Sequence, residues 1–420
     1  MANATRTAPR TVVRNARLFD SIAGRWLPGS TLVIEGDTIA TVTQETLTVH
    51  DVACEIDAGG RAVLPGLIDA HVHVVATSHD LAGLALQPAS LVAAESAQLM
   101  AAMLRRGFTT VRDAGGADHG LRSALERGLF QGPRLYIAGQ PISQTGGHAD
   151  MRPQGVRGPM YCACAGLGLV GAIADGVGEV RRAVREQVRQ GANHIKIMAG
   201  GGVSSPTDPI DGTQFSLEEL RAAVEEAEAA NLYALAHAYS PRAVTRAVQA
   251  GVRSIEHGNL IDEATARVMK QHGAFYVPTL ATYAALAEEG ARLGWSEAML
   301  LKLQGVADKG LEAVRIARSE GVPVVFGTDL LGRMHGRQNS EFALRAPAVP
   351  PLEVLQSATA VAARLMGLEG RIGALVPGAW ADLLVVDGDP GTSLDMLATP
   401  ETGLRLVMQA GRVIEDRLAA

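Results

Sequence analysis

Six side chains that can bind metal ions follow short apolar segments spread over most of this chain. They are His71, His73, Lys196, His237, His257 and Asp329. The segments that carry them have the composition of β-strands, and they are 64–73, 194–200, 233–238, 254–258 and 322–329. Side chains delivered from the carboxyl ends of successive parallel strands meet at one end of a barrel, where such folds build their active sites. The pattern therefore predicts a single metal centre assembled from distant parts of the sequence.

The histidines and the aspartate have the chemistry expected of such a centre. His71 and His73 are two residues apart, so on a strand they point to the same side and can bind one cation. Taken singly, a histidine such as His237 or His257 is more often a core or loop residue than a ligand. Asp329 ends the last segment, and a carboxylate there can bind a metal and also take a proton from a water molecule.

Lys196 is the most specific of the six. It lies between Ile195 and Ile197 in a segment that should be buried, and a buried lysine is costly unless it is paired. The simpler alternatives are a lysine that extends to solvent or one that forms a Schiff base. A free ammonium cannot bind a metal, whereas a carbamate formed with CO₂ offers two oxygens that can bridge two ions. We therefore predict an N6-carboxylated Lys196 between two divalent ions, with zinc as the expected metal.

Strand-like and helix-like segments alternate through the middle of the chain, which is typical of parallel βα units. The eight predicted strands lie around 64–73, 109–114, 134–139, 194–199, 233–238, 254–257, 275–279 and 323–328. Helix starts are visible between them. Ser216 and Glu219 form a capping box, and 241–251 begins with proline and ends with glycine.

The two ends of the chain share a different pattern, in which short β-branched runs are broken by glycine, proline and aspartate. We expect residues 1–63 and 368–420 to form one composite β-sandwich domain, and residues 64–367 to form the metal-dependent barrel. The predicted fold class is thus α/β, a distorted (β/α)₈ TIM barrel flanked by a composite β-sandwich.

The composition excludes several classes of partner. The 420 residues carry a net charge of −6 without a sustained block of one sign, which argues against nucleic acid. No apolar run is long enough to span a membrane, and the start of the sequence lacks the apolar stretch of a signal peptide, so we expect a cytoplasmic protein. Three cysteines are too few for a disulfide framework. Cys162 and Cys164 are expected to be small buried residues, and a soft metal pair is the less favoured alternative.

With these residues in place, the chain resembles the amidohydrolase superfamily, and specifically its subtype with two metals and a carboxylated lysine. The His-Val-His sequence at 71–73, Lys196 and the GxxxPGxxADLLVVD sequence at 373–387 carry the likeness, which covers essentially the whole chain. The segments TGGHAD (145–150), KIMAGGGVSS (196–205), HAYSP (237–241) and SIEHG (254–258) resemble the branch that contains imidazolonepropionase-like hydrolases, prolidase-like carboxypeptidases and ochratoxinase. Imidazolonepropionases lack a bridging lysine, so Lys196 favours the two-metal branch.

The resemblance implies that polar residues in the loops bind the substrate. His148 lies beside glycines that allow close backbone approach, and it can donate to the scissile carbonyl. Tyr239 lies two residues after His237 and so faces the same way; its hydroxyl can stabilise an oxyanion or hold a carboxylate. Arg333, His335 and Arg337 follow Asp329 and suit recognition of a free carboxylate. No organic cofactor site is expected.

The expected activity is metal-dependent hydrolysis of an amide bond in an N-acyl amino acid or a dipeptide, with release of the C-terminal amino acid. Aromatic amides similar to ochratoxin are among the candidate substrates. The alternatives are opening of a cyclic amide or lactone, or deamination, on the same barrel. A scaffold without activity is disfavoured, because all six metal-binding side chains are present. Since the family commonly assembles, we also expect a homo-oligomer.

Overall fold

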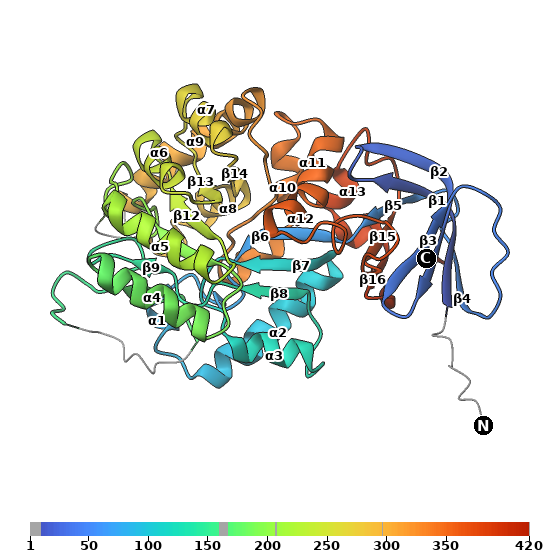
Figure 1. Ribbon diagram of the computed structural model, residues 1–420, viewed down its shortest axis with the longest axis horizontal. Helices are drawn as coiled ribbons and strands as arrows, with labels where there is room; N and C mark the ends of the chain where they lie inside the picture. Colours follow the sequence, from blue (N-terminus) through green and yellow to red (C-terminus); the bar gives the residue numbers. More distant parts are fainter. Residues whose placement is uncertain (1–9, 159–166, 206–207, 296, 420) are drawn as a thin grey trace. The chain divides into compact units, whose positions relative to one another are not determined.

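The computed structural model describes residues 10–158, 167–205, 208–295 and 297–419 (Figure 1). The chain divides into two compact units. The first contains residues 1–68, 104–109 and 350–420, and the second contains residues 69–103 and 110–349. None of the helices in the described ranges is long and apolar enough to cross a membrane.

The first unit is built on one eight-stranded sheet that combines strands from both ends of the chain. Its strands are β1 (Arg10–Asp20), β2 (Arg25–Glu35), β3 (Thr38–Thr43), β4 (Val52–Asp57), β5 (Ala62–Pro65), β15 (Leu383–Val386), β16 (Leu404–Gln409) and β17 (Arg412–Asp416). The central strand β1 pairs antiparallel with β2 and parallel with β4 and β5. Strand β15 then joins β5 to β16, so the two chain ends share one hydrophobic core that includes Val13, Leu32, Val385 and Leu406.

Four short helices complete the first unit, namely α11 (Pro351–Ser357), α12 (Ala360–Met366), α13 (Asp395–Ala398) and α14 (Pro400–Gly403). Within the described part of this unit the strands are hydrogen-bonded into one sheet. Strand pairing therefore shows a composite sheet built from both chain ends, and it does not show the two layers of the predicted sandwich.

The second unit contains parallel strands with helices between them, a mixed α/β arrangement. A six-stranded sheet has the order β10 (Ala172–Ile173), β9 (Ile142–Ser143), β11 (Ile195–Met198), β12 (Ala234–Ala238), β13 (Ser254–His257) and β14 (Phe275–Val277). A three-stranded sheet has the order β6 (Leu67–Val72), β7 (Phe108–Asp113) and β8 (Arg134–Ile137). Strands β11 to β14 run parallel in consecutive pairs, and so do β7 and β8. Seven of the eight predicted strands therefore coincide with observed ones.

The eighth predicted strand, 323–328, is not a regular strand. It is an extended segment with one isolated bridge, between Val324 and Tyr276. Phe326 accepts a hydrogen bond from the backbone of Ala70, and the amides of Thr328 and Asp329 both donate to His71. Proline at 323 has no amide hydrogen to give to a ladder, which limits regular pairing. The parallel strands consequently stand as two sheets, and the barrel is not closed by strand pairing in the described residues.

The helices of the second unit follow the strands in chain order. They are α1 (Leu81–Leu84), α2 (Ala89–Arg105, whose end belongs to the first unit), α3 (His119–Glu126), α4 (Val177–Arg189), α5 (Leu217–Ala229), α6 (Pro241–Gln249), α7 (Glu263–Gln271), α8 (Leu280–Glu289), α9 (Glu297–Ser319), the 3₁₀ helix η1 (Gly332–Arg337) and α10 (Ser340–Arg345). Helices α4 to α7 pack in sequence on the outside of β11 to β13 (Figure 1). The predicted capping box is confirmed, since Ser216 and Glu219 satisfy each other's backbone amides at the start of α5.

Candidate metal centre

The structure brings all six predicted metal-binding side chains together in the second unit. They come from the ends of β6, β11, β12 and β13 and from the extended segment before Asp329. All six line one cavity with a volume of about 60 Å³. Five of them are buried, and Lys196 is only 1% exposed. Residues separated by more than 250 positions along the sequence thus surround one small space.

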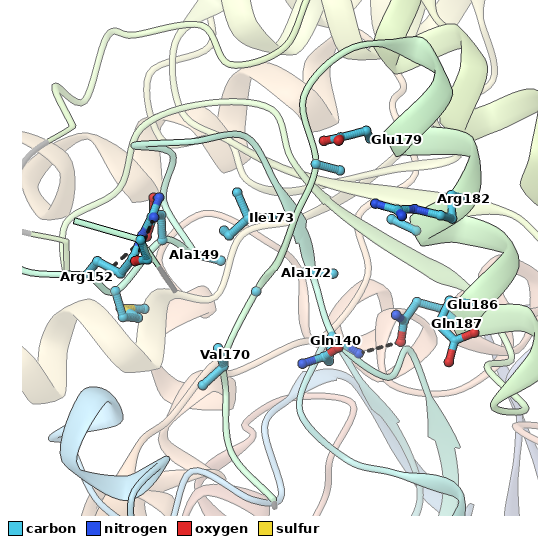
Figure 2. A pocket seen from close by; sticks show the side chains of 16 residues that line it. Gln140, Ala149, Arg152, Val170, Ala172, Ile173, Glu179, Arg182, Glu186 and Gln187 are labelled. Carbon is cyan, nitrogen blue, oxygen red and sulfur yellow. Dashed lines mark hydrogen bonds and ion pairs between the residues drawn. The ribbon is translucent and has the colours of Figure 1, made fainter. Parts of the chain in front are cut away.

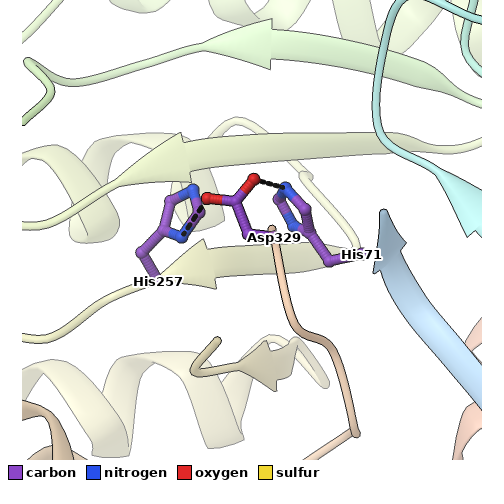
Figure 3. A group of neighbouring side chains, drawn as sticks. All are labelled: His71, His257 and Asp329. Atoms are coloured by element: carbon purple, nitrogen blue, oxygen red, sulfur yellow. Dashed lines mark ion pairs between the residues drawn. The ribbon is translucent and has the colours of Figure 1, made fainter. Parts of the chain in front are cut away.

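The Asp329 carboxylate lies between histidine rings, as Figure 3 shows for His71 and His257. Its Oδ1 is 3.4 Å from Nε2 of His71 and 3.2 Å from Nε2 of His73. Its Oδ2 is 3.9 Å from Nδ1 of His257. One ligand atom from each of His71, His257 and Asp329 can be chosen so that all three lie within 4.8 Å of one another, which is close enough to hold one metal ion.

Three residues at this site have backbone conformations that residues other than glycine rarely adopt. His257, Asp329 and Thr279 have φ angles of 75°, 54° and 50°, in the left-handed region. Next to Asp329, Gly327 packs so closely that a Cβ there would lie 2.9 Å from Cβ of His71. Strained residues of this kind cluster at functional sites, where the surrounding structure holds them. The left-handed turns place the ligand side chains at the point where each extended segment ends.

Three of the histidines are oriented by a second contact on their Nδ1 atom. Nδ1 of His73 donates to the carbonyl of Gly115 at 2.8 Å, and Nδ1 of His257 lies 2.8 Å from the hydroxyl of Thr279. Nδ1 of His71 lies 2.7 Å from Oε2 of Glu256. Such contacts fix the ring and its tautomer, and they leave Nε2 as the atom that can bind a metal.

His237 is held differently. Its Nε2 donates to the carbonyl of Gly201 at 3.0 Å, and its ring stacks on His148 with the centroids 4.3 Å apart. In this arrangement only its Nδ1 is available as a ligand atom.

The surroundings of one buried atom, Nε2 of His71, indicate whether these residues suit a metal ion. Among the described residues, Nε2 of His71 is buried without a hydrogen-bond partner. When Nδ1 carries the hydrogen toward Glu256, Nε2 presents a lone pair to Asp329 at 3.4 Å. A lone pair and an anionic oxygen at that distance repel unless a positive charge lies between them. Imidazole and carboxylate donors around such a position suit a divalent ion of the zinc type.

Burial and neighbouring charges favour the metal-binding forms of these groups. Burial lowers the pKa of both His237 and His257 well below the usual range, so their rings are neutral. Burial lowers the pKa of Lys196 to about 8, which makes the neutral amine accessible near physiological pH.

Two charged residues of this site were missed from the sequence. Glu256 contacts His71, and Arg112 on β7 binds both oxygens of Glu256 at 2.8 and 2.9 Å. Both side chains are fully buried. The signal that identified Lys196, a charged residue inside an apolar strand segment, was also present at both of these positions. Asp69 binds the side chains of Thr328 and Gln338, so it braces the segment that carries Asp329.

Two of the five predicted substrate residues, His148 and Tyr239, line the same cavity. Nδ1 of His148 lies 3.2 Å from the hydroxyl of Ser205. Tyr239 is 3% exposed, its ring stacks on His257, and its hydroxyl accepts a hydrogen bond from Tyr283 at 2.9 Å. The hydroxyl hydrogen of Tyr239 therefore remains available to a ligand.

The other three predicted substrate residues lie on η1 and do not line this cavity. Arg337 pairs with Glu288 at 2.6 Å and with Glu289 at 3.1 Å, and Arg333 pairs with Glu289 at 3.2 Å. His335 is buried, with Nε2 donating to the carbonyl of Ala76 at 3.2 Å. A role in substrate binding would require the two arginines to leave the glutamates of α8.

The remaining wall of the cavity that the six candidate ligands line is mostly apolar and includes Leu81, Met151, Leu169, Leu286 and Trp295. A second cavity of about 630 Å³ shares Ala149 and Met151 with it (Figure 2). Figure 2 shows Glu179, Arg182 and Gln187 of α4 on one side of this larger cavity and Arg152 on the other. Cys162 and Cys164 lie outside the described residues, and Cys54 is a free, exposed thiol.

Comparisons with known proteins identify the family of this chain. A model described as the amidohydrolase family matches residues 62–414. Ochratoxinase from Aspergillus niger is 34% identical over 396 residues, which cover 90% of this chain and 81% of that protein. A prolidase complexed with N-methylphosphonate-L-proline is 47% identical, with a TM-score of 0.94 over 97% of this chain and 100% of that chain. A Xaa-Pro dipeptidase with methionine bound in its active site is 30% identical, with a TM-score of 0.87 over 96% of this chain and 99% of that chain. The chain belongs to the amidohydrolase family.

Proposed function

We propose that this protein is a metal-dependent hydrolase that cleaves the amide bond of an N-acyl amino acid or dipeptide and releases the C-terminal amino acid. The observation that carries the proposal is the buried Nε2 of His71, which has no hydrogen-bond partner and faces the Asp329 carboxylate in a cavity lined by five histidines and a lysine. The ochratoxinase, prolidase and dipeptidase relatives support the amide as the bond that is cleaved.

The proposed centre holds two divalent ions, with zinc as the preferred metal. Its ligands are His71, His73, His237, His257, Asp329 and a carboxylated Lys196. Burial of the Lys196 amine in this cavity supports the carbamate, because burial lowers its pKa to about 8 and the neutral amine is the form that reacts with CO₂. When bound, such ions lower the pKa of a water molecule toward about 7 and polarise the scissile carbonyl.

The residues of the chain then supply positioning and proton transfer. Asp329 accepts the proton of the attacking water, whose oxygen bonds to the carbonyl carbon. As the C–N bond breaks, Asp329 returns the proton to the leaving nitrogen, so that an acid and an amine are formed. Its place between His71, His73 and His257 keeps the carboxylate anionic and directed into the cavity.

His148 and Tyr239 have two proposed roles, oxyanion stabilisation and binding of the substrate carboxylate. The variant Tyr239→Phe separates them for the tyrosine. Loss of an oxyanion contact lowers kcat/KM for every substrate, whereas loss of a carboxylate contact lowers it only for substrates with a free carboxylate. Tyr283→Phe is the matched control, since it removes the neighbouring hydroxyl that donates to Tyr239 and leaves the Tyr239 hydroxyl in place.

The activity itself is tested by a hydrolysis screen with zinc-loaded protein. N-acyl amino acids and X-Pro and other dipeptides are compared with ochratoxin-like aromatic amides, and the released amino acids are quantified. Hydrolysis of cyclic amides or lactones alone, or release of ammonia alone, would contradict the proposed reaction and support one of the alternatives on the same site.

Three further proposals concern the molecule as a whole. We propose that the parallel strands of residues 64–367 form a closed, distorted (β/α)₈ barrel, for which the hydrogen bonds of 323–329 to Tyr276 on one side and His71 on the other are the support. We propose that residues 1–63 and 368–420 form the composite sandwich domain. We also propose that the protein is cytoplasmic and forms a homo-oligomer. Light scattering of purified protein would test the oligomeric state.

A further inference from the structure

We infer that the buried ion pair between Arg112 and Glu256 is a positioning device that orients His71 so that its Nε2 faces the metal. This inference rests on the proposed metal centre. Neither residue faces the cavity, so both act through His71.

The contacts of the pair converge on His71 from two directions. Oε2 of Glu256 lies 2.7 Å from Nδ1 of His71 and orients the ring. Nε of Arg112 donates at 2.5 Å to the carbonyl of Ala70, the residue directly before His71. Arg112 also binds both carboxylate oxygens of Glu256, while Ser254 donates to Oε1 at 2.5 Å. The ring of His71 and its preceding peptide are therefore held by one connected network.

Charge explains why the network contains an arginine. A carboxylate with its side chain fully buried is strongly destabilised without a partner. The guanidinium of Arg112 binds both oxygens of Glu256 and compensates its charge, and the same carboxylate accepts the hydrogen on Nδ1 of His71. Nε2, the buried atom that faces Asp329, is then the ring atom left to bind a metal. Without the anion, either tautomer of His71 could form.

The second unit contains a matched pair that lacks this connection. Arg345 and Glu341 on α10 are 2.7 Å apart, with side chains that are 1% and 0% exposed. Glu341 accepts from the amide of Ala281, and Arg345 donates to the carbonyl of Val325. The two pairs have similar burial and the same charges, and the Arg112–Glu256 pair contacts the proposed ligand His71 directly. The Arg345–Glu341 pair is therefore the control.

The experiment compares two double variants, Arg112→Met/Glu256→Gln and Arg345→Met/Glu341→Gln, in the full-length protein. Each removes both charges of one pair, which avoids leaving a single buried charge without its partner. Zinc affinity is measured by competition with a chromogenic chelator, and folding is monitored by circular dichroism and by Tm. We expect the first variant to bind zinc about 10- to 100-fold more weakly, since contacts behind a ligand histidine contribute on that scale. The control should change zinc affinity by less than about threefold.

A second readout follows the tautomer directly. In metal-free protein labelled with ¹⁵N-histidine, the His71 signals, assigned with His71→Asn, should show hydrogen on Nδ1. The first double variant should lose this preference and the control should keep it. If the first variant does not fold, Ser254→Ala provides a milder change, with an expected loss of zinc affinity of roughly three- to fivefold from one weakened hydrogen bond.

Equal losses of zinc affinity in both double variants, or no loss in the first, would overturn the inference, because the pair would then contribute only to stability. Wild-type protein that binds no zinc would overturn it together with the proposed centre. Wild-type protein that binds zinc but cleaves no amide would contradict only the proposed reaction, and the affinity comparison would still decide the inference.

Discussion

Two groups of charged side chains in the second unit differ in how they are held. Around His71, the charges of Arg112 and Glu256 are fully buried, and each has several partners at fixed distances. On η1, Arg337 is 35% exposed and pairs with Glu288, which is 63% exposed. Exposed pairs contribute little to stability, about 0–1 kcal/mol, whereas breaking a buried pair costs several times more. We expect the chemistry to depend on the buried charges of the proposed metal centre and not on those of η1, and three substitutions and one change of substrate test this.

The largest effect should come from Lys196→Ala, which removes a buried side chain of the proposed metal centre. Loss of the proposed bridging group should remove bound metal and activity together, and small carboxylates such as acetate should partly restore both. Metal content is measured on purified protein by elemental analysis, beside hydrolysis rates. Full metal content with native activity in this variant would rule out a bridging role. A map of the metallated, active wild-type enzyme with an unmodified amine would do the same.

The next effect should come from Asp329→Asn. An amide oxygen can still coordinate a metal, so we expect the fold and much of the metal to remain. The proton transfer is lost, and kcat should fall by roughly 10²–10⁴, the range that removal of a general base usually gives. Steady-state kinetics at matched metal content provide the measurement. A kcat near that of the wild type would assign the proton transfer to another residue, with His148 as the next candidate.

A smaller effect should follow from blocking the C-terminal carboxylate of the substrate. Loss of a charge-assisted contact costs about 1.5–3 kcal/mol. Amidated substrates should therefore be cleaved at least about tenfold more slowly in kcat/KM than the free acids. Equal rates for both forms would favour a general amidase, or a cyclic-amide or lactone hydrolase, on the same metal centre.

The smallest effect should come from the partly exposed charges on η1. Arg337→Met removes the ion pairs to Glu288 and Glu289. Because Arg337 is partly exposed and does not line the cavity, we expect Tm to change little and kcat/KM for a free-acid substrate to fall by less than about threefold. A loss of ten- to a hundredfold that disappears with the amidated substrate would instead show that Arg337 binds the substrate carboxylate, as the sequence suggested.

Sequence reasoning located the site residues whose direction follows from the alternation of side chains along a strand. Two residues on alternate positions of a strand face the same way, so His71 and His73, and likewise His237 and Tyr239, could be assigned to one side in advance. The extended segment before Asp329 was located correctly, but its irregularity was not anticipated. That irregularity depends on Pro323 and on the close packing of Gly327 against His71, which is a contact between distant segments.

Loop residues could not be located in the same way, because their direction is set by partners elsewhere in the fold. Arg337 turns toward α8 only because Glu288 and Glu289 lie there. No repeating pattern in the sequence predicts that η1 lies beside α8. The importance of Glu256 likewise depends on its contacts with His71 and Arg112, which the positions of these residues along the chain do not reveal.

The left-handed backbone at His257 and Asp329 has a practical consequence for anyone who engineers this protein. Residues other than glycine pay roughly 1 kcal/mol or more to adopt that conformation, and glycine adopts it freely. A directed-evolution campaign that selects only for heat resistance would therefore favour glycine at these two positions and would discard the ligands. Selection for stability and selection for activity therefore act in opposite directions at these two residues. A library of variants of this protein should be screened first for catalytic turnover and then for heat resistance.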